Sequence, residues 1–321
     1  MSKVSIILPV YNGERYIKET INSLLDQTIQ VEIVVVDDGS TDKTAEIVKS
    51  FIDSRLRGND RSGEDKRIKY FYQKNSGSPA KPRNKGLKEA RGEFVGFCDQ
   101  DDIYYPGKLE KQIKVYEGCK DRDKIGIIIS SADLIDESGR VVGQNIKPFE
   151  GFMGSKEAYE LLLRGDFITA CSALVPRKIF DEIGYLDESL KGVDDYDLWL
   201  RISQRYGILT IKEPLCAWRQ SKEAMSADKA KQYIETEKVF EKLEKEDKSE
   251  RIRIGHSKNL MRIFIAKNLE KDFAYAEDLL LKLKKYPITK KGQIVISVFE
   301  LSHSLSFWFL RLLQLIGRVS L

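Results

Sequence analysis

Two stretches decide the fold: VSIILPVYN at residues 4–12 and VVVDDGSTD at residues 34–42. Each is a β-branched run stopped by turn residues, which is typical of a buried strand. Between them, apolar residues recur at three- and four-residue steps from Tyr16 to Leu25, which predicts a helix. A strand, a helix and a second strand in short order predict parallel pairing through a right-handed crossover, with helices on both faces of the sheet.

The alternation of strands and helices continues to residue 225. We expect further strands over residues 68–72, 93–98, 125–131 and 174–176, and helices over residues 83–90 and 194–202. The polar stretch 53–67 is typical of a solvated loop. Beyond residue 225 the chain is charged and helical, without strand signals. We therefore expect an α/β domain over residues 1–225 and a helical C-terminal extension over residues 226–321.

Composition excludes several classes of protein. With 321 residues, of which 41% are hydrophobic and 32% charged, the chain can bury a core. A net charge of only +4 argues against a dedicated nucleic-acid binder. Four scattered cysteines and two histidines argue against a disulfide framework and a zinc site. The N-terminal segment lacks the features of a secretory leader, so we expect a cytoplasmic protein.

Acidic residues lie where ligands bind in parallel sheets, at predicted strand ends and helix starts. Asp37-Asp38 follows the second strand, Asp99-Gln100-Asp101 follows the fourth, and Asp194-Asp195 begins a helix. Alternate residues of an extended segment point the same way, so Asp99 and Asp101 can face one ligand. Two converging carboxylates suit Mg²⁺ or Mn²⁺ with phosphate oxygens completing the shell. Taken singly, each cluster also fits a solvated turn or a helix cap.

Together these segments resemble the family 2 inverting glycosyltransferases, which have the GT-A fold. The resemblance covers roughly residues 3–225 in the family's order, and implies a mostly parallel central sheet flanked by helices. Its motifs are VSIILPVYN (4–12), VVVDDGSTD (34–42), Asn75-x-Gly77 with RNKG (83–86), DQDD (99–102) with Pro106 and Leu109, and DDYDLWLR (194–201).

The resemblance also implies roles for individual residues. Asp101, together with Asp99, would bind the Mn²⁺ or Mg²⁺ ion that bridges the donor diphosphate. Asp195 would be the general base that takes a proton from the acceptor hydroxyl. Pro9, Tyr11 and Asp38 would line the base pocket and Asp99 would lie near the ribose, so that the implied donor-binding set is Pro9, Tyr11, Asp38, Arg83 and Asp99.

This division of labour suits an in-line displacement, which needs a base on the acceptor side and charge neutralisation on the leaving diphosphate. We expect transfer of a sugar from a nucleoside-diphosphate donor, UDP-linked, to a hydroxyl of a glycan or lipid-linked acceptor in cell-surface polysaccharide synthesis. One alternative is a sugar-nucleotide nucleotidyltransferase, although residues 11–15 lack its Gly-rich, basic phosphate loop. Another is a catalytically silent sugar-nucleotide-binding scaffold.

Near the motifs, one segment departs from the family, and Arg219 and Trp199 each have two interpretations. Many members carry Arg-x-His where this chain has Arg219-Gln220-Ser221. Arg219 fits either a diphosphate contact or a surface salt bridge. Trp199 fits either sugar stacking or the core, and Cys98 is expected to be a small buried hydrophobe.

The C-terminal extension concentrates the basic charge. Residues 226–321 hold 19 Lys+Arg and 13 Asp+Glu, a net +6 that leaves −2 for residues 1–225. Apolar residues at steps of three and four predict one amphipathic helix over residues 294–315, too interrupted by charge to span a membrane. We expect residues 282–318 either to lie on the inner face of the cell membrane or to pack on the catalytic domain or a homodimer partner.

Overall fold

The computed structural model describes residues 2–53, 66–221 and 227–315. It forms two compact units: Met1–Leu162 with Phe167–Lys222, and Leu163–Asp166 with Glu223–Leu321. The boundary expected at residues 225 and 226 lies outside the described residues, as does most of the loop expected over residues 53–67.

A ten-stranded sheet organises the first unit, in the order β3-β2-β1-β4-β9-β6-β10-β5, with β7 paired to β6 and β8 to β10. The strands that run in one direction are β1 (Val4–Val10), β2 (Val31–Asp37), β3 (Ile68–Tyr72), β4 (Phe94–Phe97), β6 (Ile125–Ile135) and β10 (Gly207–Arg219). The short strands that run the other way are β5 (Ile103–Tyr104), β7 (Val141–Asn145), β8 (Gly151–Met153) and β9 (Leu174–Pro176). The mostly parallel sheet is therefore confirmed.

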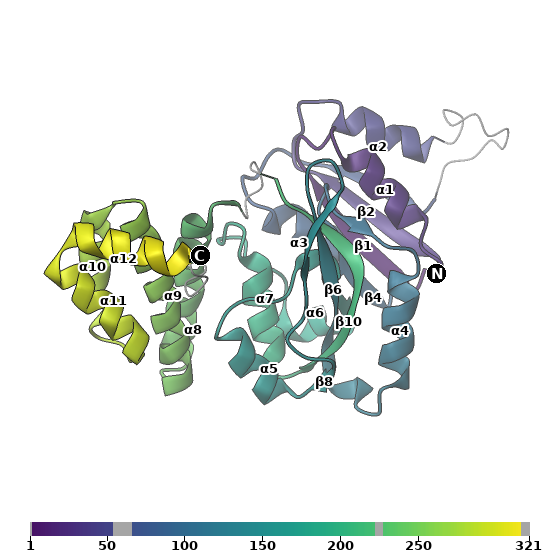
Figure 1. Cartoon of the computed structure of the whole chain (residues 1–321). Helices are drawn as coiled ribbons and strands as arrows, with labels where there is room; N and C mark the ends of the chain where they lie inside the picture. Colours follow the sequence, from purple (N-terminus) through teal and green to yellow (C-terminus); the bar gives the residue numbers. More distant parts are fainter. Residues whose placement is uncertain (1, 54–65, 222–226, 316–321) are drawn as a thin grey trace. The chain divides into compact units, whose positions relative to one another are not determined.

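Helices cover both faces of this sheet (Figure 1). On one face, Ile6 and Leu8 join the core that includes residues of α1 (Ile17–Leu25), α2 (Thr44–Ile52) and α4 (Lys108–Gly118). On the other face lie α3 (Ala80–Glu89), α6 (Lys178–Ile183) and α7 (Asp194–Ser203). There Gly86 of α3 lets the helix approach β1, because a Cβ would stand 2.7 Å from Cγ2 of Ile7. The unit also contains α5 (Ser155–Leu162) and the 3₁₀ turns η2 (Arg122–Lys124) and η3 (Ala170–Ser172).

The sequence pattern missed β10, which pairs with β6 along its length. Its apolar alternation is interrupted by two exposed residues and a proline, Lys212, Glu213 and Pro214. The pairing register shifts on both sides of Pro214, which is the behaviour expected of a bulge. The alternation of apolar and polar residues is therefore visible only in two short fragments, although the chain forms one strand there.

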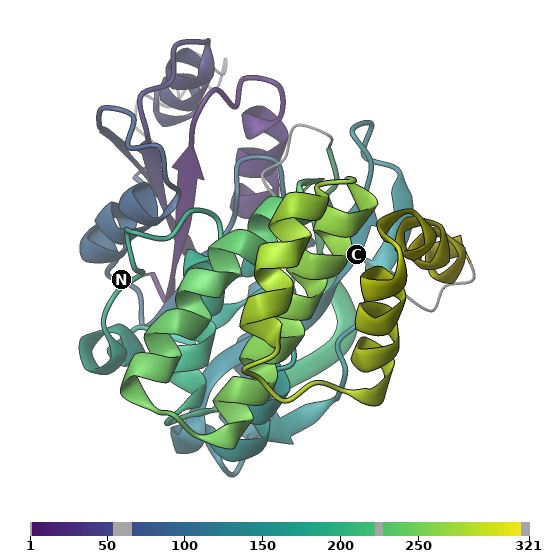
Figure 2. The ribbon, with the colours of Figure 1, turned by 90° about the vertical axis from the view of Figure 1, so that its left-hand side faces the viewer.

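The second unit is helical, with α8 (Lys229–Glu246), α9 (Glu250–Leu269), α10 (Phe273–Leu283), α11 (Lys290–Leu301) and α12 (His303–Leu315), coloured green to yellow (Figure 2). Leu260, Phe264, Leu280, Phe299 and Leu310 are among its core residues. No helix in the described part of the chain is long and apolar enough to cross a membrane.

The prediction of a single helix over residues 294–315 is wrong, because the helical structure is interrupted at Ser302. That residue is extended, with φ −168° and ψ 126°. Its hydroxyl accepts a hydrogen bond from Leu305 N at 3.4 Å, so a side chain that favours helix starts begins α12.

Candidate active site

The loop after β1 is held by a side chain from the loop after β4. The Gln100 amide accepts a hydrogen bond from Tyr11 N at 2.8 Å and donates one to Tyr11 O at 3.1 Å. Asn12, in the left-handed region at φ 49°, accepts a bond from Thr41 N at 2.8 Å. Tyr11 is 47% exposed at this edge of the sheet, where a planar ligand can reach its ring.

Asp38 is buried and already has several hydrogen-bond partners. Its carboxylate accepts bonds from Gln73 Nε2 at 2.6 Å, from Ser76 N at 3.0 Å and from Ser76 Oγ at 2.8 Å. A carboxylate has about four acceptor positions, so three bonds leave about one for a ligand. Pro9 is also buried, paired with Val36 inside the sheet. The loop between β3 and α3 is thus part of the candidate base pocket, through Ser76, the unspecified middle residue of the Asn75-x-Gly77 motif.

Arg83 joins two of the predicted acidic clusters. Its guanidinium donates to Asp99 Oδ1 at 2.8 Å and to Asp194 Oδ2 at 2.9 Å. The Arg83 side chain is 6% exposed and Asp194 is fully buried, whereas Asp99 is 40% exposed. Burial lowers the pKa of Arg83, but Asp99, Asp194 and Asp195 raise it well above its usual value. The end of β4 and the start of α7 therefore form one site.

Asp195 stands half-buried in the first turn of α7, next to this bridge. One of its carboxylate oxygens accepts a hydrogen bond from Tyr196 N at 2.9 Å. Burial raises the pKa of the neighbouring Asp194, while Arg83 opposes that rise. The two adjacent carboxyls therefore have different surroundings, a buried one tied to Arg83 and a more accessible one.

Asp101 is the carboxylate of this region best suited to a cation. Burial, with the nearby charge of Asp99, raises the pKa of Asp101 to about 6. A rise of this kind means that the two negative charges are incompletely compensated. Two carboxylates are hard oxygen ligands, and diphosphate oxygens would complete a Mg²⁺ or Mn²⁺ shell. Among the described residues, no group of three or more His, Cys, Asp or Glu side chains that could hold a metal ion occurs.

Arg219 forms an ion pair, but with its own side chain buried. Its side chain is 1% exposed, so it is not a surface salt bridge. It donates to Asp101 O at 2.9 Å, to Asp136 O at 3.0 Å and to Glu19 Oε2 at 2.7 Å. These bonds hold the backbone at Asp101 in place, so Arg219 stabilises the acidic loop.

Two other expectations are settled by burial. Trp199 is fully buried and packs edge-on against Phe97 at 5.9 Å, so it belongs to the core and not to a sugar platform. Cys98 is fully buried, as expected for a small hydrophobe.

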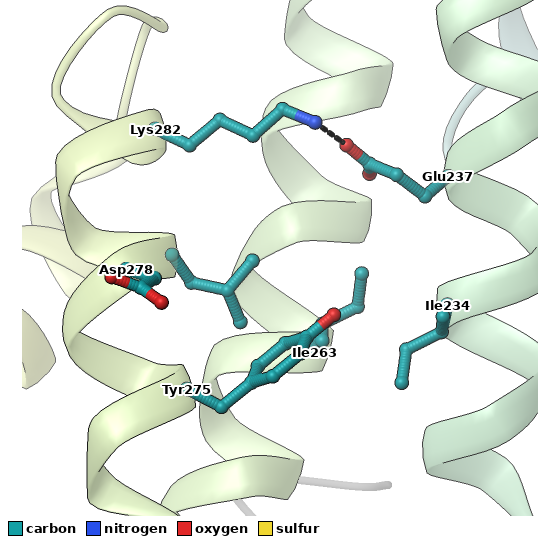
Figure 3. A pocket seen from close by; sticks show the side chains of 7 residues that line it. Ile234, Glu237, Ile263, Tyr275, Asp278 and Lys282 are labelled. Carbon is teal, nitrogen blue, oxygen red and sulfur yellow. Dashed lines mark hydrogen bonds and ion pairs between the residues drawn. The ribbon is translucent and has the colours of Figure 1, made fainter.

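A separate cavity of about 260 Å³ lies among α8, α9 and α10 of the helical unit (Figure 3). Glu237 and Lys282 form an ion pair across it. None of the predicted site residues lines it. We therefore keep the candidate active site at the carboxyl edge of the sheet.

The model of Glycosyl transferase family 2 matches residues 5–184, more than half of the chain. The chain therefore belongs to the family 2 glycosyltransferases, and its first unit has the GT-A fold.

Two relatives illustrate how much of the chain is shared. The uncharacterized glycosyltransferase RC0461 of Rickettsia conorii is 41% identical over 62% of this chain and 31% of its own length. A relative in Rickettsia typhi matches over 60% of its length, so the chain spans less than two thirds of the first curated relatives. The Escherichia coli UDP-Glc:alpha-D-GlcNAc-diphosphoundecaprenol beta-1,3-glucosyltransferase WfgD is 31% identical over 71% of this chain and 81% of its own.

Two solved structures share the fold. The crystal structure of S. aureus TarS 1–349 with UDP-GlcNAc has a TM-score of 0.67 at 21% identity, covering 99% of this chain and 93% of that one. The Pyrobaculum calidifontis mannosyltransferase PcManGT, in complex with GDP-Man and Mn²⁺, has a TM-score of 0.58 at 17% identity, covering 96% and 83%.

Proposed function

We propose that this glycosyltransferase inverts the anomeric centre while moving a sugar from a UDP-linked donor to a hydroxyl of a glycan or lipid-linked acceptor in cell-surface polysaccharide synthesis. The observation that carries the proposal is the Arg83 bridge between Asp99 and Asp194. It holds a donor-side carboxylate beside the start of α7, where Asp195 lies. The names of two similar proteins support the substrate classes, UDP-GlcNAc for TarS and a diphosphoundecaprenol-linked acceptor for WfgD.

Asp195 is the general base in this proposal. A base for an acceptor hydroxyl has to be ionised and accessible, and Asp195 is more exposed than the buried Asp194. The hydroxyl oxygen attacks the anomeric carbon as Asp195 takes its proton, while the bond from that carbon to the diphosphate oxygen breaks. Because the hydroxyl attacks in a single displacement from the side opposite the leaving diphosphate, the configuration at the anomeric carbon inverts. No covalent nucleophile is needed.

Asp101, together with Asp99, is the proposed holder of Mn²⁺ or Mg²⁺. Such an ion, when bound, neutralises the negative charge of the leaving diphosphate. Tyr11 and Asp38 are the proposed contacts to the base, with Pro9 shaping the end of β1, and Arg83 orients Asp99 toward the donor. Arg83 has little accessible surface of its own, so we assign it a positioning role.

The proposed acceptor implies that the enzyme works at the inner face of the cell membrane. A lipid-linked sugar keeps its reactive hydroxyl close to the bilayer surface, so a peripheral enzyme meets it more often than a freely diffusing one does. The proposed contact segment is residues 282–318, and a homodimer is the competing use of the same segment.

The test is a donor screen. Purified protein is incubated with UDP- and GDP-linked sugars and with Mn²⁺ or Mg²⁺, and release of the nucleoside diphosphate is followed. We expect release from one UDP-sugar. Formation of a sugar nucleotide from a sugar phosphate and UTP would instead support a nucleotidyltransferase. Donor binding without any turnover, in the presence of lipid-linked acceptors, would support a silent scaffold.

A further inference from the structure

Helix α12 carries apolar residues on two sides, and the helical unit buries only one of them. Leu310 is fully buried, together with Phe299 of α11. The other side consists of large apolar residues that are more than half exposed: Leu305 at 54%, Trp308 at 69% and Leu312 at 57%. Their spacing of three and four residues places them on one line along the helix.

Two further large apolar residues are exposed on α11. Leu301, at the end of that helix, is 79% exposed, and Ile294 is 55% exposed. We call the five residues the apolar stripe: Ile294, Leu301, Leu305, Trp308 and Leu312. The packed core of the unit uses none of them. Large exposed apolar residues that share one face of a helix, as Leu305, Trp308 and Leu312 do, are typical of a binding surface.

The charge around the stripe is positive. Residues 282–315 contain six basic residues and one acidic residue, and one of the six, Lys282, is paired with Glu237 and Glu241 of α8. The acidic residue, Glu300, lies 2.9 Å from Lys284 Nζ and is therefore neutralised. Lys290 and Lys291 occupy the first turn of α11, and Arg311 lies between Trp308 and Leu312; all three are exposed. Within the described part of the chain, no ion pair engages these three side chains.

A second copy of the chain would bring the same positive charge to the stripe. An anionic bilayer supplies both things that the surface lacks, an apolar phase for the stripe and negative charge for the flanking cations. Trp308 suits that boundary, because tryptophan gathers at membrane–water interfaces.

We propose that the apolar stripe binds the surface of a bilayer rich in anionic lipid, with α12 lying in the headgroup region and Lys290, Lys291 and Arg311 facing the lipid phosphates. The inference deepens the proposed function, because it supplies the surface on which a lipid-linked acceptor would be met. Binding to lipid itself needs no turnover, so the two proposals can fail separately.

The experiment is co-sedimentation of the full chain with vesicles of phosphatidylcholine alone or mixed with phosphatidylglycerol. The wild type should sediment with the mixed vesicles and stay in solution with pure phosphatidylcholine. Trp308→Ser with Leu312→Ser should weaken binding about tenfold or more, since two large apolar side chains no longer enter the interface. Lys290→Gln with Lys291→Gln should weaken it about tenfold and reduce its salt dependence.

The matched control is Val141→Ser with Val142→Ser, two apolar residues of β7 that are 59% and 61% exposed in the other unit. This control should bind vesicles as the wild type does. Equal binding by the stripe variant and the wild type would overturn the proposal, as would a wild type that ignores anionic vesicles. Circular dichroism of each variant checks that the helices remain folded.

Two further readouts separate the competing explanations. On vesicles the fluorescence of Trp308 should shift to the blue, which the Trp308→Ser variant should lose. Light scattering in solution tests the homodimer: a wild-type dimer that the stripe variant converts to a monomer would assign the stripe to a second copy and overturn the lipid proposal. Donor turnover without vesicles should be the same in wild type and stripe variant. If no donor is turned over while vesicles are still bound, only the proposed function fails.

Discussion

Arg83 donates a hydrogen bond to Asp194 at 2.9 Å, and both side chains are almost completely buried. The same guanidinium reaches Asp99 at 2.8 Å. Strand β4 and helix α7, nearly a hundred residues apart in the sequence, are thereby fixed to each other at the site. The proposed donor and acceptor sides of the reaction thus share one ion-pair network.

The first prediction concerns the stability of this network. Arg83→Met leaves Asp194 buried without a partner, so the free energy of unfolding should fall by about 3–5 kcal/mol. Arg140→Met is the control, since Arg140, whose side chain is 83% exposed, pairs with Asp136, and the loss of such a pair should leave the free energy of unfolding almost unchanged. Urea unfolding measures the free energy of unfolding of both variants, and equal losses of that free energy would contradict the structural role of Arg83.

The second prediction concerns the loop that carries Tyr11. Gln100→Ala removes both bonds to the Tyr11 backbone, each with a net value of about 1 kcal/mol. We expect the dissociation constant for UDP to rise about tenfold, measured by calorimetry. Gln144→Ala removes an exposed amide bonded to Asp133 on the β6–β7 hairpin and should leave UDP binding unchanged. If Gln100→Ala binds UDP like the wild type, the loop does not belong to the donor site.

The third prediction concerns the cation. Asp101→Asn removes the proposed ligand, so the Mn²⁺ affinity in the presence of UDP should fall about tenfold or more. The control is Asp102→Asn, because burial raises the pKa of Asp102 well above its usual range. Asp102 is 2% exposed, and one of its oxygens accepts a hydrogen bond from Arg219 N at 3.1 Å, so the carboxyl is not accessible to the ion and the amide should leave Mn²⁺ binding unaltered. Mn²⁺ titrations followed by electron paramagnetic resonance compare the two, and equal affinity in Asp101→Asn and wild type would contradict the assignment.

The fourth prediction concerns pH and the helical unit. His256 Nδ1 lies 2.7 Å from Glu244 Oε1 and Nε2 lies 2.9 Å from Glu237 Oε1. Burial lowers the pKa of His256, but the two carboxylates outweigh burial and raise it above 6.5. Lys282, on α10, also pairs with Glu237, and the Tyr286 hydroxyl donates to Glu244.

A raised histidine pKa gives stability that is complete below pH 6.5 and lost as the pH rises through the folded value. The lowered pKa of Glu237 acts in the opposite sense, giving stability above pH 4.5 that is lost in stronger acid. Hydrogen-exchange protection of α9, corrected for intrinsic rates, should therefore decline above pH 6.5. His256→Gln should flatten that decline, and an unchanged slope would contradict it.

Sequence reasoning located the acidic clusters, because motif residues at strand ends need only the local pattern and the parallel topology. It did not find Gln100 as the clamp on Tyr11 or Arg219 as the support of Asp101. Arg219 acts through the backbone carbonyls of Asp101 and Asp136, both distant in the sequence. Strand β10, which carries Arg219, has a bulge at Pro214 that interrupts its pattern in the sequence. Likewise, the apolar period across residues 294–315 continues through Ser302, although that side chain ends one helix and starts the next. Long-range hydrogen bonds of this kind leave no periodic pattern in the sequence.

The central claim is that Asp195 is the base of a glycosyl transfer, and Asp195→Asn tests it most directly. With the donor that the wild type turns over, we expect transfer to fall about 10³-fold or more while the dissociation constant of that donor stays within about twofold. Asn keeps the size and the hydrogen bond from Tyr196 N but cannot take a proton at neutral pH. Transfer at the wild-type rate by Asp195→Asn would contradict the account.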